Sequence, residues 1–185
     1  NTKFGRKEFL HLVIIEWNDK FKIGVEVVDK AHAKLFRITK KLLELSEDAS
    51  SNQSTFREGV KYLEAYSMMH FSEEETYMRS IRYSGYAQHK RVHDNFRDST
   101  LVSLKKDLEL SHYSPAAIQR FVATMNSWLK THIMQEDQAI VGKAPVKKGY
   151  DFSSQIPIIT KTINRATQEL FQAEAKLSNP NYKGQ

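Results

Sequence analysis

The sequence contains no cysteine among its 185 residues. This absence excludes disulfide bonds, iron–sulfur clusters and thiolate metal sites. It also favours the cytoplasm as the compartment, since small secreted domains are often stabilised by disulfides. Any metal bound by this chain must therefore rely on nitrogen and oxygen ligands.

Long apolar runs are missing as well. The longest, from Phe9 to Ile15, is interrupted by His11 and is far shorter than the roughly 20 residues that cross a bilayer. The chain shows no signal-peptide pattern, so we expect no membrane association. Because the first residue is Asn1 and not Met, the chain is consistent with a segment of a longer protein.

A single strongly basic surface is also absent from the sequence pattern. The net charge is +6, which raises the question of nucleic acid. The Lys and Arg residues are spread evenly, however, usually beside Asp or Glu and without interleaved aromatic residues. We therefore expect a mixed, solvated surface and no nucleic-acid partner.

Glycine and proline are scarce, at 7 and 4 residues, and helical periodicity dominates the pattern. Helices are predicted over about 28–47, 55–79, 86–108 and 115–141. A capping box of Thr55 and Glu58 would start the second helix, and the pair Ser114-Pro115 would start the fourth. Gly142 suits a helix C-cap. The prediction is an all-α, antiparallel up-down-up-down four-helix bundle.

The predicted bundle is flanked by two further segments. Residues 1–27 read as an extended N-terminal segment of a domain that spans 1–142. Residues 143–185 read as a linker and an amphipathic C-terminal helix from about Ile158 to Leu177. This helix is expected to dock on the bundle, to bind a dimer partner or to lead into another domain, such as a signalling domain.

Ligand-type residues recur on all four predicted helices, and they fall in otherwise apolar stripes. The set comprises His32, His70, Glu74, His89, His93, His132 and Asp137. Residues four apart share a helix face, which applies to His70 with Glu74 and to the two histidines of the third helix. Asp137 follows His132 by five residues, about 140° off alignment in an α-helix, so it would reach sideways and could bridge to a neighbouring ligand.

Burying so many titratable groups is costly unless they bind a metal, which takes neutral imidazole and ionised carboxylate. One such histidine is more often a core residue, but their joint placement on four helices favours a metal site. The nitrogen and oxygen donors suit iron, manganese or zinc. Seven ligands exceed the capacity of one ion and predict two. If both carboxylates and one oxide or hydroxide bridge, about one of the roughly twelve coordination positions stays open.

These residues resemble the signature of the hemerythrin and bacteriohemerythrin family over about residues 15–141. The spacing of the seven ligand-type residues carries the resemblance, and the run that begins His70-Phe71-Ser72-Glu73-Glu74 is similar to the family's HFxxEE motif. Further matches ahead of His32 are Trp17, Gly24-Val25 and Asp29. Ala31 departs from the family, which often has Gln there, but this position is no ligand.

The resemblance implies a non-haem di-iron centre with an oxo or hydroxo bridge and dioxygen as its ligand. It implies that one iron is bound by His89, His93 and His132. His32 and His70 would bind the iron with the open position. Glu74 and Asp137 would bridge the two irons.

The side chains around the open position decide whether dioxygen is bound or consumed. The expected pocket consists of Leu35, Phe71, Trp128, Leu129 and Ile133. None of these is an acid or a base, and a dry pocket favours reversible binding. We therefore expect an oxygen carrier or store, or the sensory input module of a larger protein, and not an enzyme. The predicted C-terminal helix favours sensing, since a free-standing store would not need it.

Three other functions are alternatives to dioxygen binding, one at the same site and two based on other sequence motifs. A di-iron enzyme acting on peroxide or nitric oxide would share the site. The dipeptide His93-Asp94 is typical of metal-dependent phosphohydrolases, but that hypothesis leaves Glu74 and His89 unexplained. Two ExxH strings, 8–11 and 109–112, match ferritin-like oxidases, but the first lies near the chain start and the second abuts the turn at residue 114.

Overall fold

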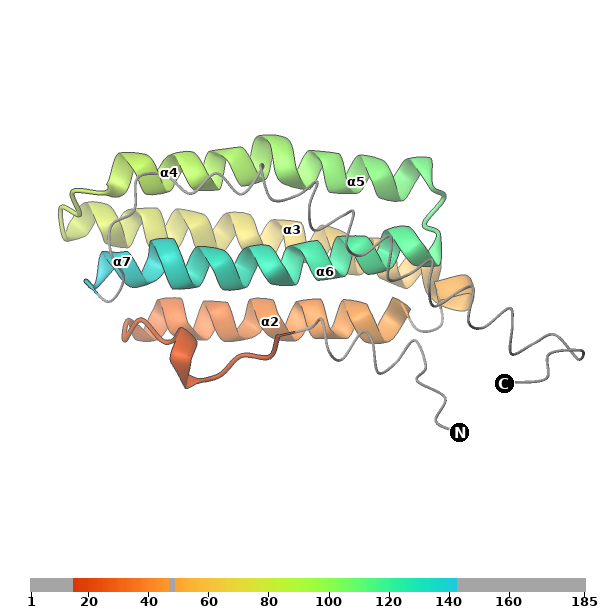
Figure 1. Ribbon diagram of the computed structural model, residues 1–185, viewed down its shortest axis with the longest axis horizontal. Helices are drawn as coiled ribbons and strands as arrows, with labels where there is room; N and C mark the ends of the chain where they lie inside the picture. The colour runs from red at the N-terminus through yellow and green to blue at the C-terminus, as the bar shows by residue number, and fades with distance from the viewer. Residues whose placement is uncertain (1–14, 47–48, 143–185) are drawn as a thin grey trace, which may run out of the picture.

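The computed structural model describes residues 15–46 and 49–142 (Figure 1), and in these ranges every regular element is helical. The elements are η1 (Asp19–Phe21), α2 (Glu26–Ser46), α3 (Ala49–Ser80), α4 (Tyr86–Asn95), η2 (Phe96–Thr100), α5 (Leu101–Leu110), α6 (Pro115–His132), η3 (Ile133–Asp137) and α7 (Gln138–Ile140). η1 is a 3₁₀ turn, and η2 and η3 are π-helical turns. η2 joins α4 to α5, and η3 joins α6 to α7, so that the chain forms four long rods.

The four rods lie side by side as an antiparallel bundle (Figure 1). α2 packs on α3 and α6, α5 packs on α6, and α3 packs on α4, which closes a ring of four neighbours. The predicted all-α bundle is confirmed. The predicted linker and C-terminal helix of residues 143–185 lie outside the described residues. None of the helices in the described ranges is long and apolar enough to cross a membrane.

The helix boundaries follow the predicted ones except at the start of the second helix. Ser114 accepts a hydrogen bond from the Ala117 N–H at 3.3 Å, as expected of an N-cap. α3 begins at Ala49, so the predicted helix start at about residue 55, with its capping box at residues 55–58, was wrong. This stretch contains no glycine or proline. Its small polar residues therefore weaken a helix only slightly, and the buried Phe56 extends the apolar stripe of α3.

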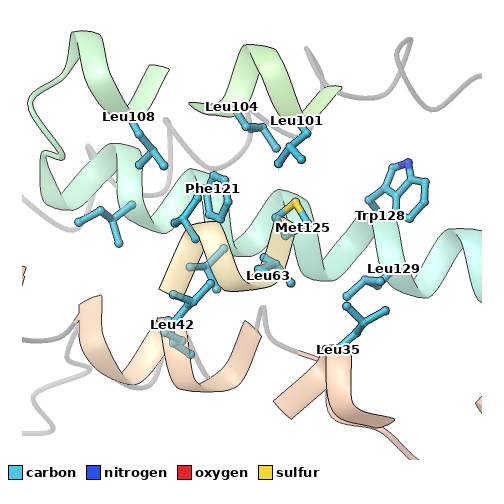
Figure 2. Packing of buried hydrophobic residues seen from close by; sticks show 14 of the residues in the cluster. Leu35, Leu42, Leu63, Leu101, Leu104, Leu108, Phe121, Met125, Trp128 and Leu129 are labelled. Atoms are coloured by element: carbon cyan, nitrogen blue, oxygen red, sulfur yellow. The ribbon is translucent and has the colours of Figure 1, made fainter. Parts of the chain in front are cut away.

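One half of the bundle interior is apolar. Figure 2 shows side chains of α2, α3, α5 and α6 pointing into the space between the rods, among them Leu42, Leu63, Leu108 and Phe121. These four side chains are at most 1% exposed. A fully buried side chain of this kind contributes about 1.5–3 kcal/mol, so this half stabilises the fold and allows polar groups in the other half.

The N-terminal segment is tied across the bundle by hydrogen bonds to its backbone. The buried Asn126 amide accepts from the Ile15 N–H at 2.8 Å and donates to the Ile15 carbonyl at 3.0 Å. Asp29 accepts from the Ile23 and Gly24 N–H groups at 2.8 and 3.0 Å, and Gly24 takes a φ of 92°, which favours glycine. These bonds hold the ring of Trp17 beside His32, with centroids 6.0 Å apart.

Candidate metal centre

The seven ligand-type side chains predicted from the sequence meet at one end of the bundle interior. α2 contributes one of them, α3 and α4 contribute two each, and α6 with its π turn contributes two: His32, His70, Glu74, His89, His93, His132 and Asp137. Each is at most 4% exposed. The antiparallel topology explains the meeting, because the start of α2, the end of α3, the start of α4 and the end of α6 share one end of the bundle (Figure 1).

Three of the imidazoles form one group. The His93 Nε2 lies 3.1 Å from the Nε2 atoms of both His89 and His132. Glu74 joins these three residues in a group whose ligand atoms all lie within 4.8 Å of one another. Adjacent ligands of an octahedral ion with bonds of about 2.1 Å lie about 3.0 Å apart. The two distances from His93 Nε2 therefore suit ligands of a common metal ion.

The other two imidazoles form a second group. The rings of His32 and His70 lie edge to face with centroids 4.6 Å apart. Together with Glu74 they again place three ligand atoms within 4.8 Å. The cluster therefore offers two adjacent positions for a metal, one with three histidines and one with two.

The two carboxylates lie between these groups. Glu74 Oε2 is 3.3 Å from the Nε2 atoms of His89 and His93, while its Oε1 faces His32 at 4.0 Å. Asp137 Oδ1 is 3.0 Å from His132 Nε2, while its Oδ2 is 3.1 Å from His32 Nε2. Each carboxylate thus presents one oxygen to the three-histidine group and the other to the two-histidine group.

Many nitrogen and oxygen atoms of the seven clustered side chains lack a conventional hydrogen bond. Within the described part of the chain, the buried atoms without a hydrogen-bond partner include His32 Nε2, His70 Nε2 and both carboxylate oxygens of Glu74 and Asp137. Leaving a buried polar atom unpaired costs about 1–3 kcal/mol. The nitrogen–oxygen distances of 3.0–3.3 Å without hydrogen-bond geometry mean that these atoms aim at shared points instead of at one another. Metal ions at those points would satisfy all of them.

The charges of the buried carboxylates also favour binding of a cation in the cluster. Burial raises the pKa of Glu74, but the contacts with the surrounding histidines outweigh it and hold the pKa well below its ordinary value. Burial lowers the pKa of His70 to about 3, so this imidazole is neutral and its lone pair is free. Burial also lowers the pKa of His132, but the facing Asp137 outweighs burial and raises it to about 10. The ionised carboxylates therefore stabilise a positive charge in the cluster, and either a proton on an imidazole or a metal ion can supply it.

The π turn η3 explains the unusual spacing between His132 and Asp137. The Gln138 N–H bonds to the Ile133 carbonyl five residues back, whereas an α-helix uses four. The turn accommodates one extra residue, so residues five apart lie on one face. The expectation that Asp137 reaches sideways by about 140° was wrong, because it assumed a regular α-helix.

The five predicted pocket residues are all buried, at 0–5% exposure: Leu35, Phe71, Trp128, Leu129 and Ile133. Phe71 stacks on His93 with centroids 4.0 Å apart, and Trp128 stacks on His132 at 4.6 Å. Both rings therefore contact the three-histidine group. Leu35 and Leu129 point toward each other between α2 and α6, while Trp128 points from α6 toward the opposite side (Figure 2).

The carboxylates of the motifs that suggested other metal enzymes lie apart from the cluster, where the structure describes them. Asp94 pairs with Lys90 at 2.6 Å and with Arg97 at 3.0 Å and is partly exposed. The Glu109 side chain is 58% exposed and pairs with Arg57. Neither carboxylate faces the buried histidines. The other ExxH string, at residues 8–11, lies outside the described residues.

Sequence reasoning missed Glu75. Its Oε1 lies 3.1 Å from the Nδ1 of His93, on the side of the ring that faces away from the cluster. The contact with His93 lowers the pKa of Glu75. The available signal was the acidic run from Glu73 to Glu75. The pattern alone did not say which of these carboxylates reaches a ligand from another helix.

Deletion of Met134, which is 37% exposed in the π turn, should leave the metal content of the purified protein unchanged. The shortened turn can become α-helical, with the aspartate four residues after His132 and on the same face. Deletion of Lys130 from the regular helix α6 should abolish metal binding, because it rotates His132 by about 100° relative to the preceding residues. Equal loss of metal in both variants would contradict the role of the π turn.

Comparisons with known proteins agree with this geometry. The family model described as "Hemerythrin HHE cation binding domain" matches residues 23–144. The bacteriohemerythrin of Clostridium acetobutylicum is 31% identical over 128 residues, which cover 68% of this chain and 97% of the relative. That of Stenotrophomonas maltophilia is 29% identical over 69% of this chain and 80% of the relative, and the myohemerythrin of Theromyzon tessulatum is 28% identical over 69% and 92%.

No solved structure matches the chain significantly. The family model nevertheless covers most of the predicted domain, and the buried cluster of histidines and carboxylates is able to hold metal ions. The chain therefore belongs to the hemerythrin family, whose domains bind dioxygen at a di-iron centre.

Proposed function

We propose that this chain binds dioxygen reversibly at a di-iron centre held by the seven clustered side chains. The observation that carries the proposal is the position of the two carboxylates. Glu74 and Asp137 each present one oxygen to a group of three histidines and the other to a group of two. Two carboxylates that bridge two irons would have this arrangement.

The ligand assignment follows the two groups. His89, His93 and His132 bind one iron, and the Nε2 atom of His93 lies at the spacing of adjacent ligands from the Nε2 atoms of the other two. His32 and His70 bind the other iron, which has one protein ligand fewer. Because this iron has two histidine ligands and the other has three, an open position for a small ligand is expected on the two-histidine side.

When bound, the di-iron centre supplies the electrons that dioxygen takes up. The chain itself contributes the ionised carboxylates that balance the charge of the metal ions and the neutral imidazoles that donate to them. Its buried apolar side chains keep water and additional proton donors away from the centre. Leu35 lies one turn from His32 on α2 and faces Leu129 (Figure 2), and we infer that these two leucines line the ligand pocket.

The physiological role that we propose is sensory input, with oxygen carriage or storage as the second possibility. Residues 143–185 follow directly on the bundle, and their sequence predicts a linker and an amphipathic helix. A store needs no such segment. In this proposal, residues 1–142 form a single domain and residues 143–185 are a segment appended to it.

The purified protein should contain about two irons per chain and should change colour reversibly when the reduced form meets oxygen. Replacing both His89 and His93 with Ala removes two of three nitrogen ligands from one iron, so iron content should fall to half or less. Elemental analysis of the purified chains measures this. His112→Ala is the matched control, since His112 is exposed in the turn before α6. Equal iron in both variants would disprove the ligand assignment.

Leu35→Thr should accelerate the decay of the oxygenated form to the oxidised form severalfold, because a hydroxyl beside His32 brings water and a proton donor to the pocket. Leu42→Thr is the control, since Leu42 is equally buried on α2 two turns away. Both changes should lower the free energy of unfolding by about 2–4 kcal/mol. Decay followed by absorbance separates them, and equal decay rates would contradict the pocket assignment.

Oxygenation should change the rate of tryptic cleavage after Lys143, Lys147 or Lys148 in the full chain severalfold if the protein is a sensor. The reason is that a sensor must pass the binding event to the residues that follow the bundle. Cleavage is measured on the reduced protein with and without oxygen. Equal rates would favour a carrier, and catalytic consumption of peroxide or nitric oxide in the same samples would favour an enzyme.

A further inference from the structure

His93 differs from His32, His89 and His132 in how its ring is held. Its Nε2 faces the three-histidine group, its face stacks on Phe71 with an interplanar angle of 13°, and its Nδ1 lies 3.1 Å from Glu75 Oε1. In the described part of the chain, the Nδ1 atoms of His32, His89 and His132 are buried and have no hydrogen-bond partner. A carboxylate therefore supports a ligand on the three-histidine side.

We propose that Glu75 is a positioning residue for the metal on the three-histidine side, acting through the Nδ1–H of His93. The Glu75 carboxylate accepts this hydrogen bond. The proton is thereby held on Nδ1, and the Nε2 lone pair stays directed at the metal. The inference rests on the proposed function, because it assumes that His93 is a ligand.

The position of Glu75 suits this role. It is one residue beyond Glu74 on α3, so it lies at the side of the cluster and not within it. It is largely buried, with a side chain 14% exposed, so water competes weakly for its hydrogen bond. Arg79, one turn further along α3, lies 4.0 Å from Glu75 Oε2 and donates to the Tyr86 hydroxyl at 2.8 Å. Arg79 thereby links the Glu75 carboxylate to Tyr86 at the start of α4.

The hydrogen bond has an electronic effect as well as a geometric one. A carboxylate that accepts from one imidazole nitrogen makes the other nitrogen a stronger donor to a metal. Stronger donation and the added negative charge stabilise the oxidised iron. Glu75 therefore lowers the reduction potential of the three-histidine iron and slows its loss, whereas no carboxylate supports the Nδ1 of His32 on the two-histidine side in the described residues.

Glu75→Ala, Glu75→Gln and the control Glu73→Gln test the proposal in the full iron-loaded chain. Glu73 is exposed on the other side of Glu74, so its substitution makes the same charge change away from His93. Glu75→Ala should speed the release of iron to a chelator by about 10–100-fold. Glu75→Gln keeps an oxygen acceptor for the Nδ1–H and should restore slow release in large part. Both Glu75 variants should have a more positive reduction potential, and Glu73→Gln should match the unchanged protein.

A purely structural role for Glu75 would change stability without moving the potential. Potentials in both Glu75 variants equal to those of Glu73→Gln and the unchanged protein would therefore overturn the proposal. So would iron release from Glu75→Ala at the unchanged rate. Lack of iron in the unchanged protein is a different result, because it contradicts the proposed function itself.

Discussion

Two fully buried carboxylates set the conditions for the rest of this structure. Glu74 and Asp137 are 0% exposed, and burying an ionised carboxylate costs several kcal/mol unless positive charge and hydrogen-bond donors compensate. The five surrounding imidazoles supply donors, but their geometry leaves the carboxylate oxygens without hydrogen bonds among the described residues. Metal ions provide the missing charge, so metal binding and the stability of this end of the bundle are coupled.

The bundle accommodates this end because the other end is apolar. Leu42, Leu63, Leu108 and Phe121 fill the interior there (Figure 2). The N-terminal segment places Trp17 beside His32 at the polar end, and Asn126 of α6 holds this segment by bonding both the N–H and the carbonyl of Ile15. The apolar half of the core and the bonded N-terminal segment together hold the helices that carry the ligand-type side chains.

The centre is asymmetric in its surroundings as well as in its ligands. Phe71 and Trp128 stack on His93 and His132, and Glu75 accepts from His93. The three-histidine side is thus enclosed by rings and supported by a carboxylate. In the proposed function, a small ligand binds on the two-histidine side, beside apolar residues that supply no proton.

The sequence by itself determined the helical class, three of the four helix starts to within about two residues and the seven ligand-type residues. These depend on spacing along one chain segment, where residues four apart share a face. The tertiary structure decided the start of α3, the π turn that aligns Asp137 with His132, and the partnership of Glu75 with His93. It also decided that Phe71 and Trp128 cover the three-histidine side. The contacts of Glu75 and Phe71 with His93 join segments far apart in the chain, which local periodicity does not encode. The π turn departs from the regular helical period, and the small polar residues at the start of α3 weaken a helix too slightly for composition to decide.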